Sequence, residues 1–581
     1  MNILGFNCYG HDSAATLLSN NKVVFAVEEE RLNRKKHFGG LPALSIDACL
    51  KYGNLDPSDL DHVTFFWKPS ISYSKIPVFL FKFWDKVPNL IREQRSFSVE
   101  ENLGMLNYLG DMRVLPKTLR KMYPGKKMNF RFHLMEHHMC HAASAFYPTH
   151  FDEAAILTID GAGEWSTCLF AHGSGNKIRK IGGVNTPHSL GAFYQAISRH
   201  LGFKLIEGPG KLMGLASYGN PDSKQYQKLK PLVKLTESGG FAIDMNYFSY
   251  HYTRKSGVSK KFNDLFGPSK ESGKDWSEAE LDLAAAAQRI VEDAFLHMTR
   301  HLKKQTGARN LCMAGGVALN SVANGLVAKE DLFDNIFIQP AAGDSGTSLG
   351  STLLLNHQIL DRKREFIMDS AFLGPEYNDG EIEKTLSKFS LPYKKLEGGF
   401  ASFAAKQLAA GKILGWFQGK MEFGPRALGN RSILANPLVA EMKNTLNARV
   451  KFREGFRPFA AIVLEEDCGV YFDSGFPNPY MLMVYNVNPE FREKLPAITH
   501  VDNSVRIQTV NKYENPRMRE LLEAFKKETG YSVLINTSFN IKGEPIVCTP
   551  FDAIHSFDRA DMDYLVIGSF VVGKKPSDLD L

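Results

Sequence analysis

The chain has 581 residues, of which 44% are hydrophobic and 23% charged, a composition typical of a globular protein with several domain-sized units. The net charge of +7 comes without any long block of like charges, so a nucleic-acid partner is not expected. Seven scattered cysteines without a CxxC pair, and a start without an apolar leader, predict a cytoplasmic protein with no disulfide framework, cysteine zinc site or membrane span.

Three short strands are predicted at the start of the chain. Apolar runs at 3–6, 14–18 and 23–27 are separated by a polar loop and by the turn SNNK. A similar series begins at 154–160, and its turn SGNK lies 155 residues after SNNK. This repeat predicts an internal duplication of an α/β unit, with Gly/Asp/Ser-rich loops at the strand ends facing a cleft.

The next segments alternate strand, glycine turn and helix. This order occurs at 310–326 and again at 335–355, which predicts ligand binding at the carboxyl ends of the strands. The alternation of strands and helices stops at 356–375, where charged residues are followed by Gly-Pro. We therefore expect one domain at 1–360 and a second α/β domain at 361–581.

The segment EHHMCHAASAF (136–146) places three histidines on a small-residue helix. His137 and His141 are one turn apart and share a face, whereas His138 points elsewhere. Two such imidazoles can bind one metal ion, although a histidine-rich surface helix without a ligand has the same spacing. The missing ligands are expected at Asp160 and Asp344, which lie in glycine-flanked loops and could equally be turn residues. This ligand set suits Fe(II), Mn(II) or Zn(II).

Nine motifs along the whole chain resemble, in order, the nodulation/cephalosporin/tobramycin O-carbamoyltransferase family. They are GFNCYGHDSAA, EHHMCHAASAF, TIDGAGEWST, GKLMGLASYG, GGVALN, AAGDSG, EFGPRALGNRSIL, VKFREGFRPFA and NTSFNIKGEPIV. The resemblance implies an α/β protein in two parts. The N-terminal domain would be Kae1-like, of the duplicated actin/Hsp70/sugar-kinase type, and the C-terminal domain would be YrdC-like.

The same resemblance implies a reaction in two steps. Carbamoyl phosphate and ATP would give a carbamoyl-adenylate in the C-terminal domain, with loss of phosphate and pyrophosphate. The N-terminal domain would transfer the carbamoyl group to a hydroxyl of a small natural product (an antibiotic, toxin or sugar) and release AMP. The implied cofactors are iron, held by His137, His141, Asp160 and Asp344, and Mg with ATP. Neither a nucleic acid nor a membrane is an expected partner, and homodimer formation is left open.

Adenylate formation brings two anionic substrates together, so cations must offset their repulsion. The arginines of the C-terminal motifs lie among Phe, Pro, Gly and Leu, which is unusual for plain surface charge. Ser538 and Asn540 are predicted to be ligands because of the resemblance. Without the resemblance they could equally be residues that form a turn. Lys451 and Arg457 are expected to be catalytic. The full set of predicted ligands for carbamoyl phosphate and ATP is Lys420, Arg426, Arg431, Lys451, Arg453, Arg457, Arg506, Ser538 and Asn540.

The N-terminal domain needs a cradle for the departing nucleotide. Gly161, Gly315, Gly316 and Asn320 are the candidates, with a tight strand-to-helix turn as the structural alternative. His11 and Asp12 lie in the first loop and are predicted to be catalytic, with His11 as a general base or as a group that orients the acceptor. A loop histidine with only structural contacts would look the same.

Other enzyme and binding classes share parts of this pattern. A threonylcarbamoyl-type tRNA-modifying enzyme, a sugar kinase or actin-fold ATPase, and a non-catalytic ATP-binding scaffold are the competing interpretations. A strong basic face, which nucleic-acid binders usually show, is not evident. A kinase has no use for the histidine pair and would release no pyrophosphate.

Overall fold

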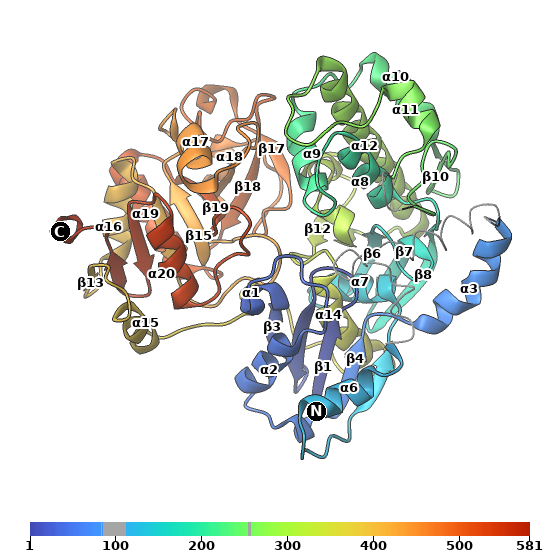
Figure 1. Cartoon of the computed structure of the whole chain (residues 1–581), viewed down its shortest axis with the longest axis horizontal. Helices are drawn as coiled ribbons and strands as arrows, with labels where there is room; N and C mark the ends of the chain where they lie inside the picture. The colour runs from blue at the N-terminus through green and yellow to red at the C-terminus, as the bar shows by residue number, and fades with distance from the viewer. Residues whose placement is uncertain (83, 85–111, 254–256, 581) are drawn as a thin grey trace. The chain divides into compact units, whose positions relative to one another are not determined.

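The computed structural model describes residues 1–82, 84, 112–253 and 257–580, and the chain divides into two compact units (Figure 1). Unit 1 comprises residues 1–29 and 37–367, and unit 2 comprises residues 30–36 and 368–581. The boundary predicted from the sequence follows residue 360, and residues 30–36 belong to the first domain in that prediction. Strands and helices alternate in both units, which confirms the predicted α/β class.

Two five-stranded sheets of the same topology form the centre of unit 1. Their strand orders are β3-β2-β1-β4-β5 and β8-β7-β6-β11-β12. Each is an antiparallel three-stranded meander extended by two parallel strands. The strands are β1 (Asn2–Asn7), β2 (Ala14–Ser19), β3 (Lys22–Glu28), β4 (His62–Phe65), β5 (Arg131–Leu134), β6 (Glu153–Ile159), β7 (Ser166–Ser174), β8 (Lys177–Asn185), β11 (Asn310–Ala314) and β12 (Asn335–Ile338), with a separate pair β9 (Val233–Leu235) and β10 (Phe241–Ile243).

The register of the repeat differs from the sequence prediction. A constant offset of 155 residues places Gly5 opposite Asp160, but Gly5 lies inside β1 whereas Asp160 follows the end of β6. The reason is that β7 has 9 residues and β2 has only 6, and β7 also carries irregular pairing with β8. Asp160 therefore corresponds in position to Cys8, the first residue after β1.

Helices α7 and α14 pack against each other between the two sheets. Helix α7 lies on β6 and β11, and α14 lies on β1 and β2. Glycine permits this close packing, because a Cβ on Gly350 would lie 1.8 Å from the Cys140 carbonyl oxygen. The helices of unit 1 are α2 (Ala43–Tyr52), α3 (Pro69–Lys82), α6 (Leu115–Met122), α7 (His137–Phe146), α8 (Leu190–His200), α9 (Gly208–Ala216), α10 (Lys224–Leu229), α11 (Lys260–Phe266), α12 (Glu278–Thr306), α13 (Ser321–Lys329) and α14 (Ser345–Leu353).

Unit 2 is built on one nine-stranded mixed sheet of order β13-β21-β20-β14-β15-β19-β16-β18-β17. Helices α16 and α19 pack together over a core that includes Trp416, Phe525 and Leu534. The strands are β13 (Tyr393–Lys395), β14 (Leu414–Phe417), β15 (Arg431–Ala435), β16 (Ala460–Leu464), β17 (Val484–Asn486), β18 (Ser504–Val510), β19 (Val533–Ser538), β20 (Tyr564–Ile567) and β21 (Phe570–Val572). The helices are α15 (Asp379–Leu386), α16 (Phe400–Ala409), α17 (Met442–Thr445), α18 (Cys468–Tyr471), α19 (Pro516–Thr529) and α20 (Pro550–Arg559).

Residues 30–36, which include most of α1 (Glu29–Asn33), are an N-terminal contribution to unit 2. Arg34 donates hydrogen bonds to the carbonyl oxygens of Pro545 (2.8 Å) and Ile546 (2.6 Å). Leu32 packs against a small core that includes Met421 and Cys548. The N-terminal segment is therefore tied to unit 2 by both polar and apolar contacts.

All seven cysteines are buried free thiols. None of the helices in the described ranges combines the length and apolar character that a bilayer crossing requires.

Candidate active sites

The histidine segment forms α7 as predicted, but the helix is not on the surface. Every residue of α7 is buried, with His137 at 1% and His141 at 0% exposure. Their ring centroids are 4.6 Å apart, so the two imidazoles do share one face. His138 turns away, with Nδ1 2.6 Å from Thr158 Oγ1 and Nε2 2.9 Å from the Ser166 carbonyl oxygen. The alternative of a histidine-rich surface helix is therefore excluded, and metal binding by this pair stays a prediction.

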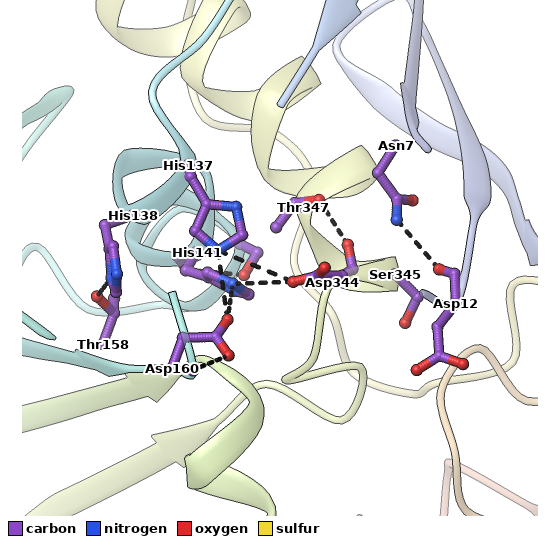
Figure 2. Close-up of polar contacts among 12 residues, drawn as sticks. Asn7, Asp12, His137, His138, His141, Thr158, Asp160, Asp344, Ser345 and Thr347 are labelled. Atoms are coloured by element: carbon purple, nitrogen blue, oxygen red, sulfur yellow. Dashed lines mark hydrogen bonds and ion pairs between the residues drawn. The ribbon is translucent and has the colours of Figure 1, made fainter. Parts of the chain in front are cut away.

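Two carboxylates converge on this pair, as Figure 2 shows. Asp160 Oδ2 lies 2.8 Å from His141 Nε2 and 3.3 Å from His137 Nε2. Asp344 Oδ1 lies 3.9 Å and 3.8 Å from the same two atoms. One ligand atom from each residue lies within 4.8 Å of all the others. The two loops and one helix face that the sequence singled out are brought together at one point.

This centre brings two buried carboxyl groups close together. Burial raises the pKa of Asp344, and the neighbouring Asp160 carboxylate adds to that rise. Burial also opposes the ionisation of Asp160, but its contacts with His137 and His141 hold its pKa well below the usual value. Although Asp344 occupies the N-cap position of α14, its side chain makes no capping hydrogen bond. Two imidazole nitrogens and two carboxylate oxygens that face one another fit a divalent transition metal.

The glycines around the centre have different roles. A Cβ on Gly161 would meet no atom within 4 Å, so this residue borders open space next to Asp160. A Cβ on Gly316 would lie 3.1 Å from Asp160 Oδ1. Gly315 has φ +93°, and a Cβ there would lie 2.2 Å from the Ile159 carbonyl oxygen, so glycine is required at this turn for the fold itself.

The prediction that Asn320 contacts a ribose or base is wrong, because its side chain is already used. Its Oδ1 accepts a hydrogen bond from the Ala323 N–H at 3.1 Å and so caps the N-terminus of α13. Its Nδ2 donates to Gln288 Oε1 at 3.0 Å, and the residue is 8% exposed. The amide is a structural cap.

His11 and Asp12 lie in the loop between β1 and β2, and they contact each other. His11 Nδ1 is 2.8 Å from Asp12 Oδ2, and 42% of the His11 side chain is exposed. Desolvation opposes protonation of His11, but the Asp12 carboxylate outweighs it, with smaller contributions from Asp344 and Asp160, and raises the pKa of His11 to about 10. Because Nδ1 is committed to Asp12, Nε2 is the atom left for a ligand.

Glu164 belongs to the same site and was missed by the sequence analysis. It is 9% exposed, and its Oε1 accepts hydrogen bonds from the backbone N–H of His137 (3.0 Å) and of Lys68 (2.7 Å). Burial raises the pKa of Glu164 to about 7. The rings of Phe66 and Trp67, which precede Lys68, pack edge-on against His137. Glu164 therefore fixes the first residue of the histidine helix to the loop after β4.

We expect Glu164→Ala to lower the free energy of unfolding by about 1–3 kcal/mol, because two backbone N–H groups lose their acceptor. Glu164→Gln keeps an acceptor oxygen and is expected to lose less than half of that amount. Urea unfolding of both variants measures the difference. Equal stability of the two variants would contradict the anchoring role.

In unit 2, Lys451 holds the S-x-N segment at the end of β19. Its ammonium donates to Asn540 Oδ1 (2.9 Å), to Ser538 Oγ (3.2 Å) and to the Ser538 carbonyl oxygen. Ser538 Oγ in turn donates to Asn540 Oδ1 at 2.7 Å. Burial and the nearby guanidinium groups of Arg453 and Arg457 hold the pKa of Lys451 well below its ordinary value. The predicted association of these residues is present, with the lysine at its centre.

Four arginines form a like-charged cluster around this lysine. Burial lowers the pKa of Arg506, and Arg426, Arg453 and Arg457 lower it further by repulsion. The same two causes, burial and then Arg457, lower the pKa of Arg453 to about 9 and of Arg426 to about 10. Glu454 lies 3.9 Å from Arg457 Nη1 and offsets only part of this charge. Lys451 is buried and the four arginines are half-buried, and a concentration of positive charge of this kind is suited to an anionic ligand. We call Arg426, Lys451, Arg453, Arg457 and Arg506 the cationic cluster.

Arg431 is not part of the cationic cluster, and its prediction as an anion ligand is wrong. The residue is fully buried, and its guanidinium donates to the carbonyl oxygens of Gln418 (2.7 Å) and Pro375 (3.1 Å) while stacking 3.7 Å from the centre of the Phe417 ring. These contacts use the Arg431 guanidinium to hold the backbone of unit 2 together, so it does not face an anionic ligand. Lys420 is exposed, and its assignment as an anion ligand stays a prediction.

Comparisons with known proteins agree with the two-part architecture. Residues 2–353 match the family described as "Carbamoyltransferase N-terminus", and residues 405–574 match "Carbamoyltransferase C-terminus". "Uncharacterized protein sll1178" of Synechocystis is 42% identical, over 98% of this chain and 96% of its own length. "Nodulation protein NolNO" of Sinorhizobium fredii is 35% identical over 98% of this chain and 80% of its own length. "Nodulation protein NolO" of Bradyrhizobium diazoefficiens is 40% identical over 77% and 80%.

Proposed function

We propose that this chain, which belongs to the carbamoyltransferase family, is an ATP-dependent O-carbamoyltransferase that works through a carbamoyl-adenylate. The observation that supports the first step best is the cationic cluster, which gathers one lysine and four arginines whose positive charges repel one another. In the full reaction carbamoyl phosphate, ATP and one water give carbamoyl-adenylate, phosphate and pyrophosphate. Transfer to an alcohol then gives the carbamate ester and AMP.

In unit 2, we infer that the cationic cluster binds carbamoyl phosphate and the ATP phosphates, with Mg²⁺ on the nucleotide. Arginine suits these groups because its planar fork donates two hydrogen bonds to one phosphate. Lys451 keeps Ser538 and Asn540 in place, so their hydroxyl and amide groups can orient the carbamoyl amide. The charge stabilisation needed when phosphate and pyrophosphate leave comes from the same cationic residues.

In unit 1, we infer that carbamoyl transfer takes place beside His137, His141, Asp160 and Asp344. These four residues would hold a divalent metal, Fe(II) by family resemblance, with Mn(II) or Zn(II) as alternatives. When bound, the metal would supply Lewis acidity for the carbamoyl carbonyl or the acceptor oxygen and would offset the charge of the two carboxylates. His11, with Nδ1 held by Asp12 and its pKa raised to about 10, would carry a proton at neutral pH and would orient the acceptor by donating a hydrogen bond from Nε2. Gly161 leaves space for the departing nucleotide.

The finer fold assignment also belongs to this proposal. The repeated topology of the two sheets in unit 1 supports a Kae1-like domain of the actin type, and we assign unit 2 as YrdC-like. For the acceptor we propose a small hydroxylated natural product. The relatives named as nodulation proteins are compatible with that class.

The purified chain, incubated with carbamoyl phosphate, ATP and Mg²⁺, is expected to release pyrophosphate only when carbamoyl phosphate is present. An enzyme-coupled pyrophosphate assay measures this step, and separation of the nucleotides shows whether AMP or ADP is formed. AMP is the product that the proposal requires. Formation of ADP without pyrophosphate would identify a kinase or a simple ATPase instead. A screen of hydroxylated natural products for carbamoyl mass gain would then identify the acceptor.

A further inference from the structure

Two loops of unit 1 are joined where His11 and Asp12 lie. The loop after β1 is hydrogen-bonded to residues 37–40: Tyr9 N–H donates to the Gly39 carbonyl oxygen (2.7 Å) and Ser13 N–H to the Phe38 carbonyl oxygen (2.8 Å). The approach is so close that a Cβ on Gly39 would lie 2.3 Å from the Gly10 carbonyl oxygen. Backbone contacts therefore hold the two loops in a fixed position relative to each other, without any contribution from the His11, Asp12 or His37 side chains.

Asp12 bridges two histidines across this junction. Its Oδ2 lies 2.8 Å from His11 Nδ1, and its Oδ1 lies 2.8 Å from His37 Nδ1. The Asp12 backbone has φ +54°, an uncommon conformation for a residue other than glycine, and Asn7 Nδ2 donates to its carbonyl oxygen at 3.1 Å (Figure 2). The structure thus holds this carboxylate between the two imidazoles.

The proton positions follow from the state of the carboxylate. Burial opposes its ionisation, but His11 and His37 outweigh this and hold the pKa of Asp12 far below its usual value. An ionised carboxylate can only accept hydrogen bonds, so both imidazoles must donate from Nδ1. His11 is thereby restricted to one orientation, with Nε2 available to a ligand. Besides Asp12, the charged groups that act on His11 are Asp344 and Asp160.

We propose that His37 is a positioning residue for carbamoyl transfer: it anchors the Asp12 carboxylate so that Asp12 holds His11 with Nε2 directed to the acceptor. The part of this proposal that concerns transfer rests on the proposed function, whereas the part that concerns the His11–Asp12 contact does not. His37 is not needed to join the loops, because the backbone bonds and the bond from Ser13 Oγ to the Gly40 carbonyl oxygen (2.8 Å) already do so. Its side chain acts on the carboxylate instead.

Three variants of the full-length chain test this role. His37→Leu removes the donor, and His37→Asn places an amide N–H near the position of Nδ1. His172→Leu is the matched control, since His172 of β7 pairs with Glu153 of β6 (2.6 Å), away from this loop junction. Melting temperature and metal content establish that each variant is folded. If His37→Leu does not fold, His37→Gln takes its place, because its longer side chain cannot put the amide where Nδ1 lies.

The first readout does not depend on the catalytic proposal. Diethylpyrocarbonate modifies neutral imidazole, and mass spectrometry of the peptide that contains His11 gives the rate at pH 7. Loss of the anchor weakens the contact that stabilises the His11 imidazolium, and one charge-assisted hydrogen bond is worth about a tenfold change in protonation. We expect His37→Leu to increase the modification rate at least about fivefold, and His37→Asn to stay within about twofold of the parent. An unchanged or slower rate in His37→Leu would overturn the anchoring role.

The second readout is AMP release from carbamoyl phosphate and ATP with water as the acceptor, a step that converts carbamoyl-adenylate and water to carbamate and AMP, with pyrophosphate release measured in the same samples. We expect His37→Leu to slow AMP release about tenfold without slowing pyrophosphate release, and His37→Asn to recover most of the loss. Equal AMP release in His37→Leu and the parent would overturn the role in transfer. If the parent itself forms no pyrophosphate, the proposed function fails, and the His11 modification rates still decide whether His37 anchors Asp12.

Discussion

Arg506→Met is expected to reduce pyrophosphate release at least about 100-fold while making the ligand-free protein more stable. The loss of activity follows because one of the cations that offset the substrate phosphates is removed. The gain in stability follows because Arg506 is half-buried and is repelled by Arg426, Arg453 and Arg457. Replacement of buried charge by an apolar side chain is commonly neutral or stabilising, by up to about 4 kcal/mol. Activity and stability are therefore expected to change in opposite directions.

The measurement combines pyrophosphate release with melting curves taken with and without pyrophosphate. Pyrophosphate should raise the melting temperature of the parent and have little effect on Arg506→Met. Arg519→Met is the matched control in the same unit, because Arg519 forms an ion pair with Glu466 and lies outside the cationic cluster. A variant that is both inactive and less stable would show that Arg506 serves the fold, and unchanged pyrophosphate release would remove it from the anion site.

The double variant His137→Ala/His141→Ala is expected to lose its bound metal. Both imidazoles direct Nε2 toward the same Asp160 oxygen, so each change removes one nitrogen ligand from the same metal site. Changes in outer-shell partners alone lower metal affinity about 10- to 100-fold, so the loss of two direct ligands should exceed that range. AMP release should fall at least about 100-fold because Lewis-acid stabilisation is lost. Pyrophosphate release, which we assign to unit 2, should continue.

Elemental analysis of the purified variant measures the metal, and separation of AMP from pyrophosphate measures the two steps. His172→Ala is the control for removal of a histidine from unit 1 outside the site. Full metal occupancy in the double variant would refute the ligand assignment. Loss of pyrophosphate release together with AMP release would refute the division of labour between the two units.

Local spacing in the sequence was enough to find the centre of the unit 1 site. Positions 137 and 141 of one helix must share a face, and residues that follow strands meet at a sheet edge, which brings Asp160 and Asp344 near them. Glu164 was missed because it contacts the backbone N–H of His137, and no side-chain pattern encodes such a contact. His37 was missed because its partner, Asp12, lies on another loop.

The errors have equally physical causes. Asn320 stands directly before a helix, which is a common N-cap position, and this signal could have identified its structural role. Arg431 lies in the same motif as Arg426, and sequence does not show that its guanidinium turns to backbone carbonyl groups. The register of the repeat differs from the prediction because β7 is longer than β2, so the two turns keep the 155-residue offset and the strand ends do not. Residues 30–36 belong to unit 2 because Arg34 and Leu32 contact residues that lie hundreds of positions away in the sequence. Local sequence patterns do not reveal contacts over such a separation.

The central claim is that His137, His141, Asp160 and Asp344 bind a transition metal where the carbamoyl group is transferred. Anomalous diffraction from crystals of the purified protein, recorded on both sides of the iron absorption edge, tests it most directly. The account predicts one strong anomalous peak between these four side chains, with iron as the scattering element. Crystals of metal-replete protein in which the four side chains point away from one another, with no anomalous peak between them, would contradict it.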